Sequence, residues 1–349
     1  MMKRLLILLL PILLLYSCRQ TLPTRTARPG NHYATGFELA DSCGITIATV
    51  YTPWEPDKVM ARYVITQPFR RLCTASCTHI GCIAALGELD KIVGVCNPEL
   101  SYTLAHSDHE VMNTGDAMSP DVERILLTHP DGVMISTYAQ GDQSAKHLQQ
   151  LDIPILFNNE WLESEPLARA EWIRFIGALL GCQAKADSLF ASIEERYVSL
   201  RDNIRNQSHP TILSGQDFRG TWYVPAGGTY MGRLFADAGA DYRYSQDLRS
   251  ESIPLTTESV LREFGQADVW VGCSARTLDE LVQIDAKHQW FKAYQNGRVY
   301  NFLHRTTPTG GNDFWERGVV HPEEVLEDLI HILYPDTTAY QLHYAEQLR

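Results

Sequence analysis

Residues 183–203, QAKADSLFASIEERYVSLRDN, decide the fold, because this stretch near the middle of the chain predicts one long helix. Its apolar residues recur at intervals of three and four positions, which places them on one stripe of a helix. They are Ala186, Leu189, Phe190, Ile193, Tyr197 and Leu200. A helix of this length spans roughly 30 Å, which is enough to reach from one lobe of a protein to another. The alternative is a long surface helix within a single lobe.

The segments before this helix predict a sheet covered by helices. Residues 166–180 predict a shorter helix, because Pro166 stands in its first turn and Gly181 follows its last. Residues 36–66 alternate between apolar and polar side chains and predict a β-hairpin. Between these two segments, short apolar runs alternate with helical patterns, an order that is typical of a parallel sheet. The predicted strands are 71–73, 92–95, 132–136 and 155–157, and the predicted helices are 80–86, 122–128 and 144–151.

The same alternation resumes after His209-Pro210. The predicted strands there are 211–214, 269–272 and 299–302, and the predicted helices are 230–238, 258–264 and 322–333. We therefore expect an α/β protein with two Rossmann-like lobes, each a mostly parallel sheet with flanking helices, bridged by a single long α-helix. The expected divisions are an N-terminal lobe over 36–165, a helical linker over 166–205 and a C-terminal lobe over 206–349. The length of 349 residues, 44% of them apolar, suits two lobes of medium size.

The N-terminus has the pattern of an export signal. Residues 1–17 predict a signal peptide, with Lys3 and Arg4 before an apolar run that is too short for a membrane-spanning helix. The ending Leu-Tyr-Ser-Cys at 15–18 resembles the lipobox of bacterial lipoproteins, which implies lipidation of Cys18 and a lipid anchor in a membrane. A plain secreted protein is the alternative. Residues 18–35 are then a lipidated tether without periodicity, and the body lies in the periplasm or cell envelope.

Composition and motifs exclude several classes of function. The formal net charge is −12 and no long basic run occurs, so nucleic acid is excluded as a partner. GxSxG, GxxxxGK[ST], HExxH and GxGxxG are all absent, and we expect no enzymatic activity. Eight cysteines leave seven if Cys18 is lipidated, so at least one thiol is unpaired. Buried, apolar cysteines are expected, with a disulfide or a metal site at 73–82 as the alternatives.

The ligand of a two-lobed α/β protein is expected between the lobes, at the loops that follow the carboxyl ends of the strands. Aromatic, cationic and imidazole groups in these loops suit a large, flat or chelated ligand. The candidate ligand-binding residues are His79, Tyr102, His106, His109, Tyr138, Trp161, Arg219, Trp222, Asp313 and Phe314. Local packing is the alternative for each of them.

Two of these loops present further alternatives. His106 and His109 are the best candidates for metal coordination, because imidazoles three residues apart can share one face of a turn. A solvated loop is the other interpretation of this pair. In residues 313–317, DFWER, we assign Asp313 and Phe314 to the ligand and Trp315 to packing, with an aromatic anchor for the C-terminal helix as the alternative.

The two halves also share a short internal similarity. Residues 122–135 and 257–271 each place a glutamate, Glu123 or Glu258, in the first turn of a helix that leads into a buried strand. This repetition indicates duplicated roles for the two glutamates. Stabilisation by the helix dipole, about 0.3 to 1 kcal/mol for each, is the alternative and is compatible with a second role.

Several stretches resemble the substrate-binding proteins of bacterial ABC importers for cobalamin, ferric siderophores and haem. The resemblance covers about residues 65–335 and rests on the order and spacing of the motifs. They are RRL at 70–72, ALGELDKIVGV at 85–95, PDVERIL at 120–126, WYVPAGG at 222–228, FADAGA at 235–240 and NGRVY at 296–300. The resemblance implies two lobes bridged by one long helix, a monomer, and no cofactor of its own.

The resemblance also implies partners and ligands. In this family one glutamate on each lobe docks into arginine pockets of a permease that a separate ATPase powers, and Glu123 and Glu258 match those positions. Cobalamin-binding members contain a piece like Asp313–Arg317, yet Asp116-Ala117 and Ile253-Pro254 stand where their corrin-flanking aromatic residues would be. Haem-binding members use Tyr or His, for which Tyr102, His106 or His109 would serve. Ferric-siderophore members use arginine and aromatic residues such as Arg219, Trp222 and Tyr138.

We therefore expect delivery of an iron chelate to an ABC importer, with a ferric siderophore first and haem or cobalamin next. Two alternatives belong to other classes. One is a chelatase-like or metal-dependent enzyme on a related two-lobed fold, and the other is a surface lipoprotein that binds another protein and takes no part in transport.

Overall fold

The computed structural model describes residues 26–55, 57–137, 143–204, 208–335 and 340–349. The predicted signal peptide, Cys18 and Tyr138 lie outside the described residues.

The N-terminal lobe is built on a five-stranded sheet in the order β10-β9-β4-β5-β6, and every neighbouring pair in it is parallel. The interior strands β9 and β4 are buried along their whole length, as expected for a parallel sheet that is covered on both faces. The predicted parallel sheet is therefore confirmed. The strands are β4 (Leu72–Thr74), β5 (Ile92–Val95), β6 (Met112–Asn113), β9 (Gly132–Ile135) and β10 (Ile155–Phe157), with a small ribbon of β7 (Gly115–Asp116) and β8 (Ser119–Pro120). The helices are α1 (Cys77–Ala85), α2 (Tyr102–Ala105), α3 (Val122–Leu127) and α4 (Gln143–Gln150).

An antiparallel sheet precedes this lobe in the chain. The predicted hairpin is present as β2 (Ile45–Tyr51) and β3 (Val59–Ile65), and β1 (Phe37–Ser42) adds a third strand to it. Phe37 packs on Trp172 with ring centroids 4.9 Å apart. Tyr63 Oη donates to the Ile155 carbonyl oxygen and accepts from the Phe157 N–H. The sheet therefore packs against both the helical linker and the edge strand β10.

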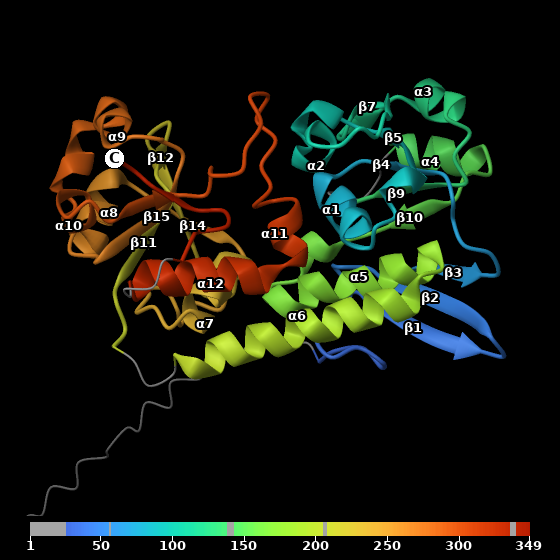
Figure 1. Cartoon of the computed structure of the whole chain (residues 1–349), viewed down its shortest axis with the longest axis horizontal. Coiled ribbons are helices and arrows are strands. Elements are labelled where there is room, and N and C mark those ends of the chain that lie inside the picture. Colours follow the sequence, from blue (N-terminus) through green and yellow to red (C-terminus); the bar gives the residue numbers. More distant parts are fainter. Residues whose placement is uncertain (1–25, 56, 138–142, 205–207, 336–339) are drawn as a thin grey trace, which may run out of the picture.

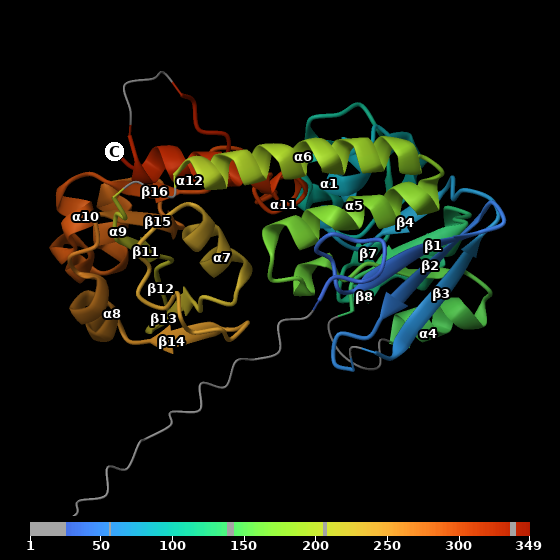
Figure 2. The same cartoon turned by 90° about the horizontal axis from the view of Figure 1, so that it is seen from below.

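Two consecutive helices follow the N-terminal lobe, α5 (Pro166–Leu180) and α6 (Gln183–Asn203), and both have the predicted bounds. Gly181 ends α5 with a φ of 75°, a conformation that favours glycine. The helices approach so closely that a Cβ at Gly177 would stand 2.3 Å from the Cβ of Ala186. Helix α6 then runs beneath both lobes, as Figures 1 and 2 show. It contacts the C-terminal lobe through Tyr197, whose Oη donates to Asp237 at 2.6 Å.

The C-terminal lobe contains two smaller sheets. One has the order β11-β15-β16-β17, in which only β17 is antiparallel to its neighbour, and the other is the antiparallel sheet β12-β13-β14. The strands are β11 (Ile212–Ser214), β12 (Asp217–Phe218), β13 (Thr221–Pro225), β14 (Ser252–Leu255), β15 (Val269–Cys273), β16 (Val299–Asn301) and β17 (Glu346–Gln347). The helices are α7 (Tyr230–Asp237), α8 (Thr257–Phe264), α9 (Leu278–Ile284), α10 (Lys292–Gln295), α11 (Arg317–Val320) and α12 (Pro322–Leu333). The expected two-lobed α/β architecture is thus confirmed, whereas the sheet β12-β13-β14 was not predicted.

Two segments pack across the divisions expected from sequence. Helix α11 lies in the C-terminal part of the chain but packs against α1 and α5. Residues 32–36, which we assigned mainly to a tether, bind the linker region. The carboxylate of Glu171 accepts the N–H groups of His32, Tyr33 and Ala34, and that of Glu163 accepts those of Thr35 and Gly36. Within the described part of the chain, no helix combines the length and apolarity that crossing a membrane requires.

Candidate functional site

The lobes meet through residues 303–316, which we call the crossing segment and which run from β16 toward the N-terminal lobe (Figure 1). The segment folds back on itself, because Thr306 and Asn312 form an antiparallel bridge. At its tip, Thr309 Oγ1 donates to the Glu99 carbonyl oxygen at 2.5 Å. A Cβ at Gly311 would stand 2.8 Å from the Leu100 carbonyl oxygen, so a larger residue would separate the two loops. The crossing segment therefore closes on the loop that follows β5.

Glu316, the last residue of the crossing segment, places a fully buried carboxylate against the N-terminal lobe. It accepts hydrogen bonds from Ser101 Oγ at 2.8 Å, from the Tyr102 N–H at 2.7 Å and from the Thr103 N–H at 3.2 Å. These donors stand at the start of α2, where backbone N–H groups have no partner within the helix. Burial raises the pKa of Glu316, and the hydrogen bonds from residues 101–103 oppose that shift. One carboxylate of the C-terminal half thus caps a helix of the N-terminal lobe.

A cation and two rings come together beside this contact. The Arg305 guanidinium lies 5.0 Å from the centroid of the Tyr102 ring, and Tyr102 stacks on His106 with centroids 4.1 Å apart. Arg305 Nε donates to Asp313 Oδ2 at 2.6 Å. The side chain of Arg305 is 40% exposed, whereas that of Asp313 is 2% exposed. Tyr102, His106 and Asp313 are therefore neighbours, as residues of one site would be, but Asp313 contacts Arg305 from the interior.

His106 and His109 do not share a common point. His106 Nδ1 lies 2.8 Å from the Tyr102 carbonyl oxygen, whereas His109 Nε2 lies 2.7 Å from the Ile92 carbonyl oxygen. Each ring therefore has one nitrogen engaged with a different backbone carbonyl. The structure favours two separately anchored rings over a shared metal ligand pair.

His79 lies below the loops, inside the N-terminal lobe. It is fully buried, with Nε2 at 3.2 Å from Ser136 Oγ and 3.8 Å from Glu160 Oε2. Burial lowers the pKa of His79 to about 4, so the ring is neutral at pH 7. Burial raises the pKa of Glu160 for the same reason, because charge is costly away from water. His79 is thus an interior residue in this structure, without surface for a ligand.

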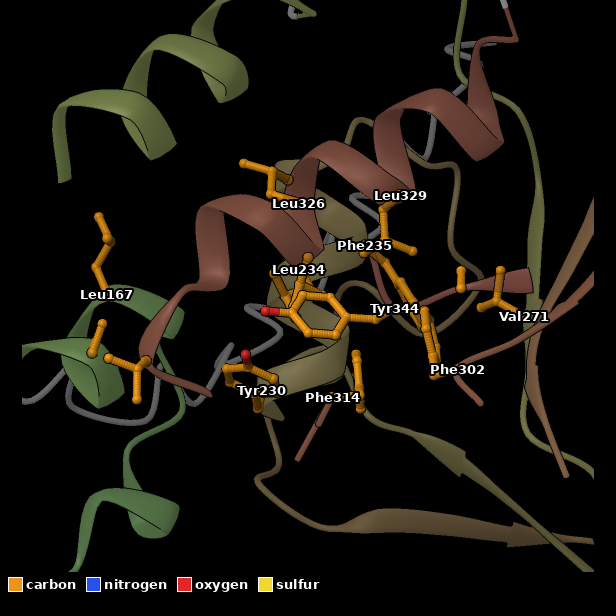
Figure 3. Close-up of a cluster of buried hydrophobic side chains, with 14 of the residues drawn as sticks. Leu167, Tyr230, Leu234, Phe235, Val271, Phe302, Phe314, Leu326, Leu329 and Tyr344 are labelled. Atoms are coloured by element: carbon orange, nitrogen blue, oxygen red, sulfur yellow. The ribbon is translucent and has the colours of Figure 1, made fainter. Parts of the chain in front are cut away.

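Trp222 and Phe314 are also interior residues, which corrects their assignment to the ligand. Trp222 is fully buried, packs on Trp270 with centroids 5.4 Å apart, and donates from Nε1 to the Ser214 carbonyl oxygen. Phe314 stacks on Phe302 at 4.3 Å and packs against Tyr344 beneath α12 (Figure 3). The neighbouring Trp315 is 47% exposed. Phe314 is therefore the packed ring of this pair, and Trp315 is the exposed one.

Trp161 and Arg219 remain at the surface. Trp161 is half-buried, and its carbonyl oxygen accepts from Arg169 Nη2 at 2.6 Å. Arg219 is exposed at the turn between β12 and β13 and lies 5.1 Å from the ring of Phe218, which is 63% exposed. No carboxylate among the described residues forms an ion pair with Arg219. This turn therefore presents an uncompensated cation beside an exposed ring.

Arg305 and Glu316 were not among our candidate ligand-binding residues, and Trp315 was assigned to packing. Arg305 and Trp315 carry signals that a sequence offers, namely a cation and an aromatic ring. Glu316 gave no such signal, because its partners at 101–103 are more than 200 positions away in the chain.

The two glutamates of the internal similarity lie at the surface. Glu123 is exposed in the first turn of α3, and Glu258 is exposed in the first turn of α8. Glu258 Oε1 accepts from Lys287 Nζ at 2.8 Å. No cation among the described residues pairs with Glu123. Both carboxylates are accessible to a partner, although Glu258 would have to exchange Lys287 for it.

The thiols and the acidic groups are the side chains that could hold a metal ion. All seven described cysteines are free, and burial raises the pKa of Cys73 to about 11 and those of Cys77 and Cys273 to about 12. Among the described residues, one group of three side chains could hold a metal ion, namely His321, Glu323 and Glu324. Their ligand atoms all lie within 4.8 Å of one another.

Two members of that group pair with each other, and the third has partners outside the group. His321 Nδ1 lies 2.9 Å from Glu323 Oε1, and Glu324 accepts from Arg317 and from Tyr344 Oη. A metal ion at Glu324 would have to compete with the Arg317 guanidinium. We therefore interpret the group as an ion-pair network.

A small cavity lies away from the crossing segment, between residues 35–36, 51–53 and 159–163. Its volume of about 20 Å³ is enough for a water molecule and far too small for a chelate. The arrangement between the lobes is therefore the better candidate for the functional site.

Comparison with known proteins gives this arrangement a context. Residues 74–304 match the family model described as "Periplasmic binding protein". An uncharacterized lipoprotein of Methanocaldococcus jannaschii is 23% identical over 298 residues, covering 81% of this chain and 70% of the relative.

Solved structures share the fold. The periplasmic heme-binding protein RhuT of Roseiflexus sp. RS-1, in apo form, is similar with a TM-score of 0.59 and 21% identity, over 76% of this chain and 98% of that one. The periplasmic vitamin B12 binding protein BtuF of Vibrio cholerae is similar with a TM-score of 0.56 and 18% identity, over 76% of this chain and 97% of that one. Because the family model spans well over half of the sequence, the chain belongs to the periplasmic binding protein family, whose members bind solutes for ABC importers and are not enzymes.

Proposed function

We propose that this chain is a lipid-anchored receptor that captures an iron chelate between its lobes and delivers it to the permease of an ABC importer. The observation that carries the proposal is the meeting of Arg305 with Tyr102 and His106, because a cation from one lobe lies against rings from the other. A ligand bound there touches both lobes at once. This is how a two-lobed binding protein would sense that it is loaded.

A ferric siderophore is the first choice of ligand. Arg219 has an uncompensated charge and Arg305 is partly exposed, and the exposed rings of Phe218 and Trp315 add flat apolar surface. Guanidinium groups beside aromatic rings suit an anionic chelate with planar arms. The chain as a whole has a formal net charge of −12, so these two arginines form a local region of positive charge. Such a region would select an anionic ligand.

Haem is the second choice and cobalamin the third. Tyr102 and His106 offer an oxygen and a nitrogen that can ligate haem iron, and one structural neighbour is named for heme binding. Another neighbour is named for vitamin B12 binding. In either case the ligand is transported cargo, which the receptor releases to the permease.

Glu123 and Glu258 are the proposed contacts with the permease. One exposed carboxylate on each lobe fixes the register of a docking face against two cationic pockets. Cys18 is the proposed site of lipidation, and the lipoprotein name of the relative from Methanocaldococcus jannaschii agrees with it. The body would then lie outside the cytoplasm and close to the membrane.

Native mass spectrometry combined with visible absorption tests the proposal. The mature chain beginning at Cys18 is purified in mild detergent and mixed with a ferric catecholate, a ferric hydroxamate, haemin and cyanocobalamin, one at a time. We expect one ligand per chain, with a charge-transfer band for a ferric chelate, a Soret band for haem or corrin bands for cobalamin. A chain that remains free of ligand after all four would contradict the proposal and favour a surface lipoprotein that binds another protein.

A further inference from the structure

We propose that Glu316 and Asp313 are positioning residues of the interlobe site: Glu316 fixes the loop that carries Tyr102, and Asp313 aims Arg305 at that ring. Together they would form one cation–aromatic platform from two lobes, suited to a planar anionic group of the ligand. The inference rests on the proposed function for its ligand, but the positioning itself is a property of the protein alone.

The first step concerns the N-terminal lobe. Helix α2 has only four residues and cannot hold its own N-terminus in place. Glu316 supplies acceptors for Tyr102 and Thr103 N–H groups and for Ser101 Oγ, the same hydroxyl that caps α2 by accepting from the Leu104 N–H. The orientation of the Tyr102 ring therefore depends on a carboxylate from the other half of the chain.

The second step concerns Arg305. The Asp313 carboxylate is buried, and it holds Arg305 Nε at 2.6 Å, which leaves the guanidinium partly exposed above Tyr102. The backbone reinforces this geometry, because the Asp313 N–H donates to the Arg305 carbonyl oxygen at 3.0 Å. A long, flexible side chain is thereby restricted before any ligand arrives, which reduces the entropy lost on binding.

The third step connects the two carboxylates. They are three residues apart, and the Glu316 N–H donates to the Asp313 carbonyl oxygen at 3.2 Å while the Gly318 N–H donates to the same oxygen at 3.0 Å. This compact turn leads directly into α11, which packs on α1 and α5. A displacement of the turn would therefore move Tyr102 and Arg305 together. A ligand that needs both groups would be held only while the lobes remain in contact.

A first experiment tests the clamp on Tyr102 without any ligand. Amide hydrogen exchange of residues 99–106 is measured in the full mature chain, in Glu316→Gln and in the milder Ser101→Ala. Glu195→Gln, on the exposed face of α6, is the matched control. We expect the Tyr102 and Thr103 amides to exchange roughly a hundredfold faster in Glu316→Gln, because a charge-assisted acceptor is lost, and to a smaller extent in Ser101→Ala. Exchange equal to that of the control in both variants would overturn the role of Glu316.

A second experiment tests Asp313 through Arg305. Dissociation constants for a ferric catecholate, a ferric hydroxamate, haemin and cyanocobalamin are measured for the wild type, Asp313→Asn, Arg305→Gln and the double variant. We expect each single change to weaken binding roughly tenfold and the double variant to resemble Arg305→Gln, because Asp313 acts through Arg305. Additive losses would overturn the positioning role. If the wild-type chain binds none of the ligands, the proposed function fails, whereas the exchange experiment still decides the role of Glu316.

Discussion

The most direct test of the fold is the replacement Glu171→Gln, because Glu171 fastens the N-terminal segment to the linker helices. Its side chain is fully buried and accepts the N–H groups of His32, Tyr33 and Ala34 at 2.8, 2.8 and 2.7 Å. Arg174 Nη1 donates to the same carboxylate at 2.9 Å. Two donors meet each carboxylate oxygen, so a glutamine can satisfy only two of the four.

The expected effect follows from the bonds that are lost. Two hydrogen bonds to a charged acceptor, at roughly 2 kcal/mol each, amount to about 4 kcal/mol of local stability. That free energy corresponds to a roughly thousandfold change in an opening equilibrium. We expect the amides of His32, Tyr33 and Ala34 to exchange with solvent faster by about this factor in Glu171→Gln.

Hydrogen exchange with fragment-level mass spectrometry over residues 28–36 measures this change. Glu195→Gln is again the matched control, because Glu195 is exposed on α6. The amides of the parallel sheet at β9 should keep their protection, which would show that only the segment has opened. An acceleration below tenfold, or one equal to that of the control, would refute the reasoning that Glu171 holds the segment.

Three further predictions concern the anchor, the docking face and acid stability. Cys18→Ser should move the protein from the membrane fraction to the soluble fraction on cell fractionation, and retention at the membrane would contradict lipidation at this residue. Glu123→Lys combined with Glu258→Lys should reduce ligand uptake by cells at least tenfold while binding by the purified protein is unchanged, because only the docking charges are reversed; Glu195→Lys serves as the control, and normal uptake would exclude the two glutamates as docking residues. Burial lowers the pKa of His79 from 6.5 to about 4. The neutral ring therefore gives its full contribution to the free energy of unfolding above pH 6.5. That free energy falls by about 3 kcal/mol as the pH drops from 6.5 toward 4, because the unfolded chain takes up a proton that the folded chain does not. Denaturant titrations should therefore show that His79→Gln loses less stability than the wild type between pH 6.5 and 4, and parallel pH profiles would disprove this.

The elements that follow a clear period were predictable from sequence. Helices α5, α6 and α12 have the predicted bounds, because Pro166, Gly181 and Pro322 mark their ends and apolar residues repeat between them. The sheet β12-β13-β14 was missed, since strands as short as two residues carry no readable alternation. The pairing of β13 in this sheet also determines which of its side chains face the core. Trp222 is buried there, whereas the adjacent Tyr223 is 53% exposed.

The candidate site was predictable only in part, for a physical reason. Adjacent residues in a turn point in different directions, and no period tells which of Phe314 and Trp315 faces the interior. Which loops carry the aromatic and cationic groups is a local property, and Tyr102 and His106 were found that way. The contact of Glu316 with residues 101–103 depends on how two distant loops meet, so it emerges only once the chain has folded.

The attachment of the N-terminal segment also limits how far the protein can travel. Arg28 already belongs to the folded body, since its N–H donates to the Ala34 carbonyl oxygen and its guanidinium lies 3.8 Å from the centroid of the Tyr51 ring. If Cys18 carries the lipid, only nine residues lie between the anchor and Arg28, and these ten Cα–Cα steps reach about 35 Å in a fully extended chain. A tether this short would keep the receptor in a thin layer above the membrane, within reach of a permease in the same membrane. Encounters with the permease would then depend on lateral diffusion in the membrane plane and on the number of receptor molecules per area of membrane.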